Sequence, residues 1–237
     1  MTARMWLRGE DGWNGGAALP ASDRAVRYGM AVFETFGVRD GKTLLVQEHL
    51  ELLSRSVREL LGTAWPVAEL PPLDPDCRGM LRVYVTAGDG GPTDAVAQPR
   101  VFAMFETIPD GETPECQAAR LHPQPVIPFA HGSKTANYWM NCAAQAGAIA
   151  SGHDHALLHD PAGNILSAAF GNLFFVVEGA LCTPSLSLAV RPGVMRAWVM
   201  RQRDVREVEC PAERLGQATE LFITNSRLGV MPLRFGS

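Results

Sequence analysis

Near its middle the chain carries Pro109-Asp110-Gly111-Glu112-Thr113-Pro114-Glu115, a run of proline, glycine and charged residues. Such a composition interrupts helices and strands and is typical of a linker. At 237 residues the chain also exceeds the usual size of a single hydrophobic core. We therefore predict a small domain over residues 1–108 and a second domain over residues 116–237, joined by a linker at 109–115.

Apolar patterning predicts one long helix and several strands in the first half. Apolar residues between Val46 and Leu61 recur at helical spacing and Gly62 follows them, which predicts an amphipathic helix. Asp40-Gly41 is typical of a hairpin turn. Runs rich in β-branched and aromatic residues predict strands at Met5–Arg8, Ala31–Val38, Thr43–Val46, Met80–Thr86 and Arg100–Thr107.

The second half shows the same mixture of patterns. The alanine-rich run Tyr138–Ser151 ends at Gly152 and predicts a buried helix, and Val194–Arg203 predicts a second helix. Strands are expected at Cys116–Leu121, His155–His159, Asn164–Ala168, Leu173–Val177, Ala180–Thr183, Val205–Glu209 and Glu220–Thr224. These predicted helices and strands in both halves indicate a mixed fold of the α/β (α+β) class.

Composition excludes several classes of function. A net charge of −4 with interspersed signs argues against a nucleic-acid surface. The five cysteines are scattered without a CxxC pair, as in a reducing compartment. The sequence shows no export signal and no run long enough to span a bilayer. We therefore expect a soluble, cytoplasmic protein that does not bind nucleic acid.

Lys134 is the first candidate for chemistry, because it is one of only two lysines and precedes the helix predicted from Tyr138. A desolvated ammonium has a lowered pKa and can act as a nucleophile or base. Alternatively, the side chain reaches the surface at an element boundary. Lys42, the other lysine, follows a hairpin turn and is expected in solvent.

Other polar positions give weaker signals. His153, His155 and His159 lie close together, but a metal site needs further convergent ligands. The segment Arg191–Arg196 opens a helix with Pro192-Gly193, where backbone N–H groups can hold a phosphate. Thr224–Gly229 places hydroxyl and amide donors directly after a strand. An imine-forming lysine with a phosphate cradle suggests pyridoxal phosphate.

Seven ordered landmarks over nearly the whole chain resemble the class IV, fold-type IV pyridoxal-phosphate enzymes, which include branched-chain aminotransferases, D-amino-acid aminotransferases and aminodeoxychorismate lyases. The matching stretches are Ser22-Asp23-Arg24 through Val32-Phe33-Glu34-Thr35, Asp40-Gly41 with Glu48-His49, Val85-Thr86-Ala87-Gly88, Ser133-Lys134-Thr135-Ala136-Asn137-Tyr138, Asn172-Leu173-Phe174, Pro192-Gly193-Val194-Met195-Arg196, and Phe222-Ile223-Thr224-Asn225-Ser226 before Val230-Met231-Pro232. In length the chain most resembles the aminodeoxychorismate lyases.

The resemblance implies a two-domain, D-amino-acid aminotransferase-like fold. Its small N-terminal α/β domain and larger, barrel-like C-terminal domain would hold pyridoxal phosphate, and a homodimer would complete each site. Lys134 falls on the Schiff-base lysine of the family, and Tyr138 falls near the tyrosine that contacts the phenolic oxygen. The family's phosphate contacts fall on the amides of Val194 and Met195 and on the Ser226 hydroxyl.

Three positions depart from the family pattern. Leu52 stands where the family's His-x-x-Arg-Leu motif has a phosphate-binding arginine; Arg55, Arg191 or Arg196 could replace that cation. Ser167 stands where the family has the glutamate that keeps the pyridine nitrogen protonated. Ala87 replaces the arginine of Thr-Arg-Gly, a substrate-carboxylate contact in the lyase branch.

The leading hypothesis is an aminodeoxychorismate lyase-like enzyme, which releases pyruvate from 4-amino-4-deoxychorismate and leaves 4-aminobenzoate for folate synthesis. Aromatisation drives this reaction, so a weak electron sink is tolerated better than in transamination. One alternative is a branched-chain or D-amino-acid aminotransferase. The other is a cofactor-free or non-catalytic descendant of the same fold.

Overall fold

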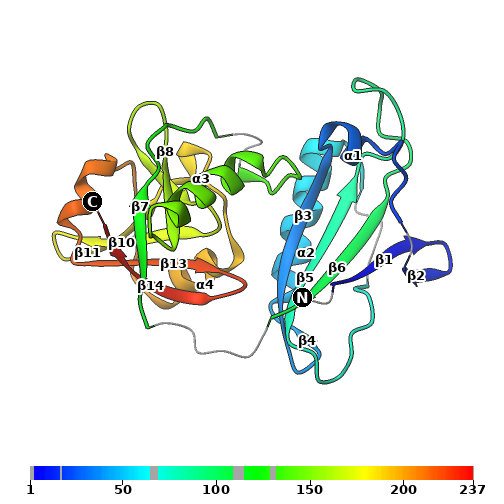
Figure 1. Ribbon diagram of the computed structural model, residues 1–237, viewed down its shortest axis with the longest axis horizontal. Coiled ribbons are helices and arrows are strands. Elements are labelled where there is room, and N and C mark those ends of the chain that lie inside the picture. The colour runs from blue at the N-terminus through cyan, green and yellow to red at the C-terminus, as the bar shows by residue number, and fades with distance from the viewer. Residues whose placement is uncertain (1–2, 17, 65–68, 109–114, 129–131, 237) are drawn as a thin grey trace. The chain divides into compact units, whose positions relative to one another are not determined.

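The computed structural model describes residues 3–16, 18–64, 69–108, 115–128 and 132–236, and it forms two compact units (Figure 1). The first comprises Met1–Gly111 together with Ser133–Asn137, and the second comprises Glu112–Gly132 and Tyr138–Ser237. Most of the expected linker lies outside the described residues. Ser133–Asn137, which the sequence assigns to the second domain, packs with the first unit.

The first unit is built on a six-stranded antiparallel sheet with the order β2-β1-β6-β5-β3-β4. Its helices are the short α1 (Arg24–Tyr28) and α2 (Val46–Ser56), which continues as a π-helical turn over Val57–Leu61. The strands are β1 (Ala3–Gly9), β2 (Gly12–Gly15), β3 (Ala31–Arg39), β4 (Lys42–Thr43), β5 (Gly79–Thr86) and β6 (Val101–Thr107).

The core of this unit lies between α2 and one face of the sheet. Leu53, Val57 and Leu61 recur at helical spacing and pack with Phe36 and Leu81 of the strands. Figure 1 shows α2 running along β3, and Gly62 ends the helical run in the left-handed conformation. The predicted strand at 43–46 is only two residues long, because α2 already begins at Val46.

A buried arginine organises the connection after β5. Arg24 is 0% exposed, and its guanidinium donates to the main-chain carbonyls of Ala87, Gly88, Gly91, Asp94 and Ala95. These bonds compensate for the desolvation of its charge. The neighbouring Asp23 caps α1 and accepts from Thr86 and Arg100.

The second unit is built on an eight-stranded sheet with the order β12-β11-β10-β13-β14-β7-β8-β9. Its longer helices are α3 (Trp139–Ala150) and α4 (Val194–Gln202). The strands are β7 (Gln117–Leu121), β8 (His155–His159), β9 (Ile165–Ala168), β10 (Asn172–Val177), β11 (Ala180–Pro184), β12 (Arg206–Val208), β13 (Glu220–Asn225) and β14 (Gly229–Phe235). Residues of β7, β10, β13 and β14 share its largest apolar cluster.

The expectation that the helix at 138–151 is buried is wrong. Only Ala144 and Ala148 are buried, four residues apart on one stripe that packs near β8 and β9. Trp139 is 87% exposed and Ile149 is 62% exposed. The abundance of alanine reflects helix propensity and one close helix-to-sheet contact rather than burial on all sides.

Two glycines, Gly79 in β5 and Gly147 in α3, give a matched test of how closely other atoms pack against the backbone at each position. An ideal Cβ at Gly79 would lie 2.2 Å from the Glu106 carbonyl oxygen, whereas a Cβ at Gly147, inside α3, meets nothing within 4 Å. We expect Gly79→Ala to lower the free energy of unfolding by about 2–4 kcal/mol. Gly147→Ala should raise it by about 0.5–1 kcal/mol. Urea denaturation measures both changes in the free energy of unfolding. Equal changes for the two variants would contradict the close contact at Gly79 and the open space at Gly147.

Candidate active site

The segment that carries Lys134 is held on β3 by main-chain hydrogen bonds. The Phe33 N–H donates to the Lys134 carbonyl at 2.9 Å, and the Ala136 N–H donates to the Ala31 carbonyl at 2.9 Å. Thr135 and Val32 form an antiparallel bridge between these bonds. The backbone of Lys134 is therefore fixed to a strand of the first unit, which limits where its side chain can reach.

The ammonium of Lys134 lies on the face of the sheet opposite α2. Its Nζ is 3.3 Å from the Thr35 hydroxyl oxygen and 4.7 Å from the centre of the Phe33 ring. The side chain is half-buried, and Lys42 is exposed as expected. A lysine positioned by a hydroxyl and an aromatic face can react with a carbonyl carbon once its amine is deprotonated.

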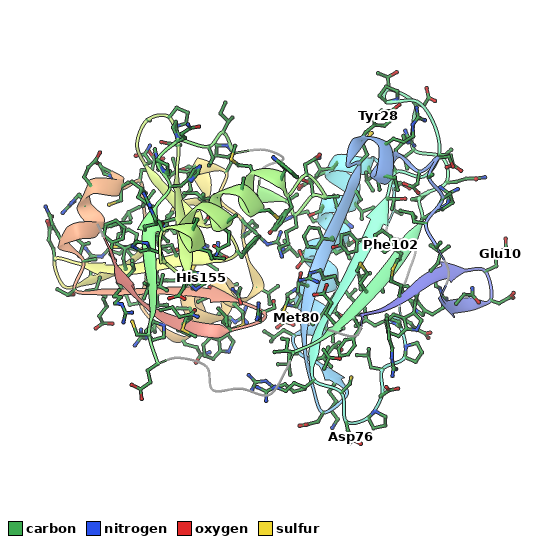
Figure 2. The ribbon with its side chains drawn as sticks, in the orientation of Figure 1. Glu10, Tyr28, Asp76, Met80, Phe102 and His155 are labelled. Carbon is green, nitrogen blue, oxygen red and sulfur yellow. The ribbon has the colours of Figure 1, made fainter. Side chains whose placement is uncertain are left out.

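An aromatic row extends from Phe33 across the sheet. Phe33 stacks on Tyr84 at 4.8 Å between ring centres, and Tyr84 stacks on Phe102 at 4.4 Å. Phe102 is labelled in Figure 2 and lies opposite Tyr84 in the pairing of β5 with β6. Burial raises the pKa of the Tyr84 hydroxyl. Sequence reasoning missed this row, because it depends on the register of three strands.

The beginning of α4 in the second unit forms a tight backbone turn. Gly193 is the N-cap of α4, and a Cβ there would lie 2.2 Å from the Asn172 side-chain oxygen. The Asn172 amide donates to the Arg191 carbonyl at 2.7 Å and fixes the turn. Val194 and Met195 occupy the first turn of the helix, where backbone N–H groups have no intrahelical acceptor. This geometry suits an anion.

The end of β13 adds hydroxyl groups to the same unit. Thr224 pairs with Asn172 in the sheet register and is 1% exposed. Its hydroxyl oxygen has no hydrogen-bond partner among the described residues. Asn225 accepts from the N–H groups of Arg227 and Leu228, which fixes the turn that carries Ser226. A buried hydroxyl without a protein partner suits a ligand with acceptor oxygens.

Tyr138 and Ser167 lie at the start of α3 and on β9. The Tyr138 ring stacks on Phe170 with 5.7 Å between ring centres, and the Asn141 amide donates to the Ala169 carbonyl at 2.7 Å. Ser167 pairs with Leu158 of β8 and is half-buried. The start of α3 is thus fixed against the segment that follows Ser167.

Arg55 and Arg196, two of the arginines that could replace the family's phosphate-binding arginine, contact other groups of the protein. Arg55 is half-exposed and lies 4.0 Å from Glu59 on its own helix. Arg196 lies 3.1 Å from Glu207 and donates to the Pro184 carbonyl. Arg191 donates to the Gly132 carbonyl at 3.4 Å. Leu52 itself is 8% exposed and packs in the core side of α2.

Within each unit, these groups fit one part of pyridoxal phosphate, the cofactor that the resemblance implies. Lys134 supplies the amine for a covalent link, and the first turn of α4 supplies amide donors for a phosphate. The partnerless Thr224 hydroxyl adds a donor in the same unit. The family's arginine is the one contact whose position is apolar here, at Leu52.

In the described part of the chain, no group of three or more His, Cys, Asp or Glu could hold a metal ion. His155, labelled in Figure 2, lies 2.7 Å from the Gln117 side-chain oxygen, and burial lowers its pKa. His159 contacts the His122 carbonyl at 3.1 Å. Among the helices described, none is long and apolar enough to cross a membrane.

Residues 31–234 match the amino-transferase class IV family, so the chain belongs to that family. A Methanocaldococcus jannaschii protein named "Putative branched-chain-amino-acid aminotransferase" is 25% identical over 97% of this chain and 86% of its own length.

Solved structures show that the fold is shared with known proteins. An aminotransferase from Brucella abortus bound to pyridoxal phosphate has a TM-score of 0.82 at 24% identity, over 98% of this chain and 91% of its own. A Legionella pneumophila structure titled "Putative 4-amino-4-deoxychorismate lyase" has a TM-score of 0.80 at 21% identity, over 92% and 87%. The expected fold-type IV architecture is confirmed.

Proposed function

We propose that this protein is an aminodeoxychorismate lyase-like enzyme that uses pyridoxal phosphate to release pyruvate from 4-amino-4-deoxychorismate and form 4-aminobenzoate for folate synthesis. The observation that carries the proposal is Ser167, a half-buried neutral hydroxyl where the family has a carboxylate. A hydroxyl cannot keep the pyridine nitrogen protonated as a carboxylate does. The reaction must then draw its driving force from elsewhere, and aromatisation of the product ring supplies it.

In this proposal each residue has a defined task. Lys134 holds the cofactor covalently and moves the proton at the substrate carbon that bears nitrogen, with Thr35 orienting its Nζ. Tyr138 binds the phenolic oxygen of the cofactor. The phosphate is bound by Ser226 and the amides of Val194 and Met195. When bound, the cofactor supplies an electron-accepting ring that stabilises negative charge on the substrate.

The second candidate is an aminotransferase for branched-chain or D-amino acids. The full-length similarity to the Methanocaldococcus jannaschii protein named for branched-chain amino acids favours it. Ser167 argues against it, because transamination needs the charged ring through two proton transfers.

The proposal includes a homodimer in the cytoplasm. The support for the homodimer is the surface of α3. This helix has no charged residue, and Trp139, Met140 and Ile149 on it are exposed. Exposed apolar surface of this kind favours association with another protein surface. Sedimentation of the purified protein measures the oligomeric state, and a monomer at micromolar concentration would contradict the dimer.

The function is tested by an absorbance spectrum and a product assay. Purified protein is titrated with pyridoxal phosphate, then supplied with aminodeoxychorismate, and pyruvate and 4-aminobenzoate are measured together. Equal amounts of both products support the lyase. Transfer of an amino group from leucine or D-alanine to a 2-oxo acid, without formation of 4-aminobenzoate from aminodeoxychorismate, would favour the aminotransferase. Absence of any cofactor spectrum would favour the cofactor-free descendant.

Leu52→Arg should tighten pyridoxal phosphate binding by about tenfold or more, because a guanidinium–phosphate pair is among the stronger charge-assisted contacts. Leu52 is buried, so the change will lower stability, and the titration is run well below the melting temperature. Leu52→Met is the control for altered packing. Equal affinities of the arginine and methionine variants would show that the phosphate does not lie near this position.

A further inference from the structure

A pair of serine hydroxyls lies beside the position of the missing arginine. Ser56 is four residues after Leu52, on the same face of α2, and is 3% exposed. Its hydroxyl oxygen is 3.1 Å from the Leu52 carbonyl and 3.1 Å from the hydroxyl oxygen of Ser133. We propose that Ser133, oriented by the Ser56 hydroxyl, donates to the cofactor phosphate in place of the arginine; this rests on the proposed use of pyridoxal phosphate.

The count of protons leaves one donor for a ligand. The Ser56 hydroxyl has a single proton, which can go to the Leu52 carbonyl or to Ser133 but not to both. When it goes to Ser133, the Ser133 proton is available to an acceptor oxygen. A phosphate can therefore be bound by rotating two hydroxyls, with no movement of the backbone.

The location agrees with the shape of the cofactor. Ser133 is the residue before Lys134, whose carbonyl is fixed by the Phe33 N–H at 2.9 Å. Pyridoxal phosphate carries its aldehyde and its phosphate arm on neighbouring ring carbons. A cofactor held by Lys134 therefore has its phosphate arm next to the position of the covalent link, and Ser56 is a polar residue of α2 that contacts the residue before the lysine.

Without a function for its hydroxyl, the burial of Ser56 would only lower the stability of the helix. A serine inside a helix competes with the backbone by bonding to the carbonyl four residues earlier, which slightly destabilises the helix. Ser56 also lies next to Leu53 and Val57, both 0% exposed, at the junction with the π-helical turn. Orienting the Ser133 hydroxyl toward a ligand gives this polar side chain a function in an apolar face.

The test compares two ligands that differ only in the phosphate. Protein freed of cofactor is titrated by absorbance with pyridoxal phosphate and with pyridoxal. We expect Ser56→Ala and Ser133→Ala each to weaken pyridoxal phosphate binding about tenfold and to leave pyridoxal binding unchanged. The matched control is Ser54→Ala on the same helix, where the hydroxyl accepts from Arg58 at 2.6 Å. It should change neither affinity.

The outcomes separate this inference from the function on which it rests. Wild-type protein that binds pyridoxal phosphate, with an unchanged preference over pyridoxal in both serine variants, would overturn the serine pair alone. Wild-type protein that binds neither ligand would overturn the proposed function as well. Restoring tight pyridoxal phosphate binding in Ser56→Ala by adding Leu52→Arg would support the serine pair as the substitute for the arginine. Ser133 is only half-buried, so its variant remains informative if Ser56→Ala does not fold.

Discussion

Lys134→Ala should lower pyruvate release at least about a thousandfold and abolish the spectrum of covalently bound pyridoxal phosphate. The side chain is the one amine positioned against Thr35 and Phe33 in the described residues, and alanine keeps the backbone bonds of the segment to β3. Binding of the phosphate should persist in part, because its proposed contacts do not involve the amine. Pyruvate assays and absorbance titrations measure the two effects separately.

The control for Lys134→Ala is Lys42→Ala, which removes the other lysine from an exposed hairpin position. Lys42→Ala should retain full activity, and both variants should melt within a few degrees of the wild type. Turnover by Lys134→Ala at the wild-type rate would exclude every mechanism that uses the lysine.

Ser167→Glu should raise the rate of half-transamination with amino acids by about tenfold or more without a matching gain in the release of pyruvate and 4-aminobenzoate from aminodeoxychorismate. A carboxylate next to the pyridine nitrogen favours its protonated form, and that charge stabilises negative charge at the substrate carbon. The comparison with Ser167→Gln isolates charge from size, because glutamine is nearly isosteric with glutamate and neutral. Stopped-flow spectra with leucine and D-alanine measure the half-reaction.

Two results would contradict the assignment of Ser167. One is rapid transamination by the unmodified protein, which would show that the Ser167 hydroxyl does not prevent transamination. The other is an equal gain in Ser167→Glu and Ser167→Gln, which would indicate a packing effect rather than an electrostatic one. Either result would move the proposed function towards an aminotransferase.

Local patterns predicted most of the fold, and the errors have physical causes. The strands β3, β5, β6, β8 and β10 and the helices α2 and α4 lie within a residue or two of their predicted bounds, except that α2 continues as a π-helical turn. β2 was missed because glycine and asparagine have low strand propensity and pair here only with β1. β14 was missed because Pro232 interrupts its pattern.

Candidate site residues could be proposed from the sequence where residue type alone limits the chemistry. Lys134 stands out by its rarity, and Gly193 by its place before a helix. The aromatic row of Phe33, Tyr84 and Phe102 and the contact of Ser56 with Ser133 depend on strand register and on packing between distant segments. No local pattern carries that information.

The guanidinium of Arg24 binds the chain after β5 only through main-chain oxygens. These hydrogen bonds therefore do not depend on which side chains that stretch carries, although Ala87 at its start is fully buried in the core of the first unit. The stretch can accumulate substitutions over evolutionary time while its path stays constant. Position 87 is the exception, because a large charged side chain there would have to leave the core in which Ala87 is buried.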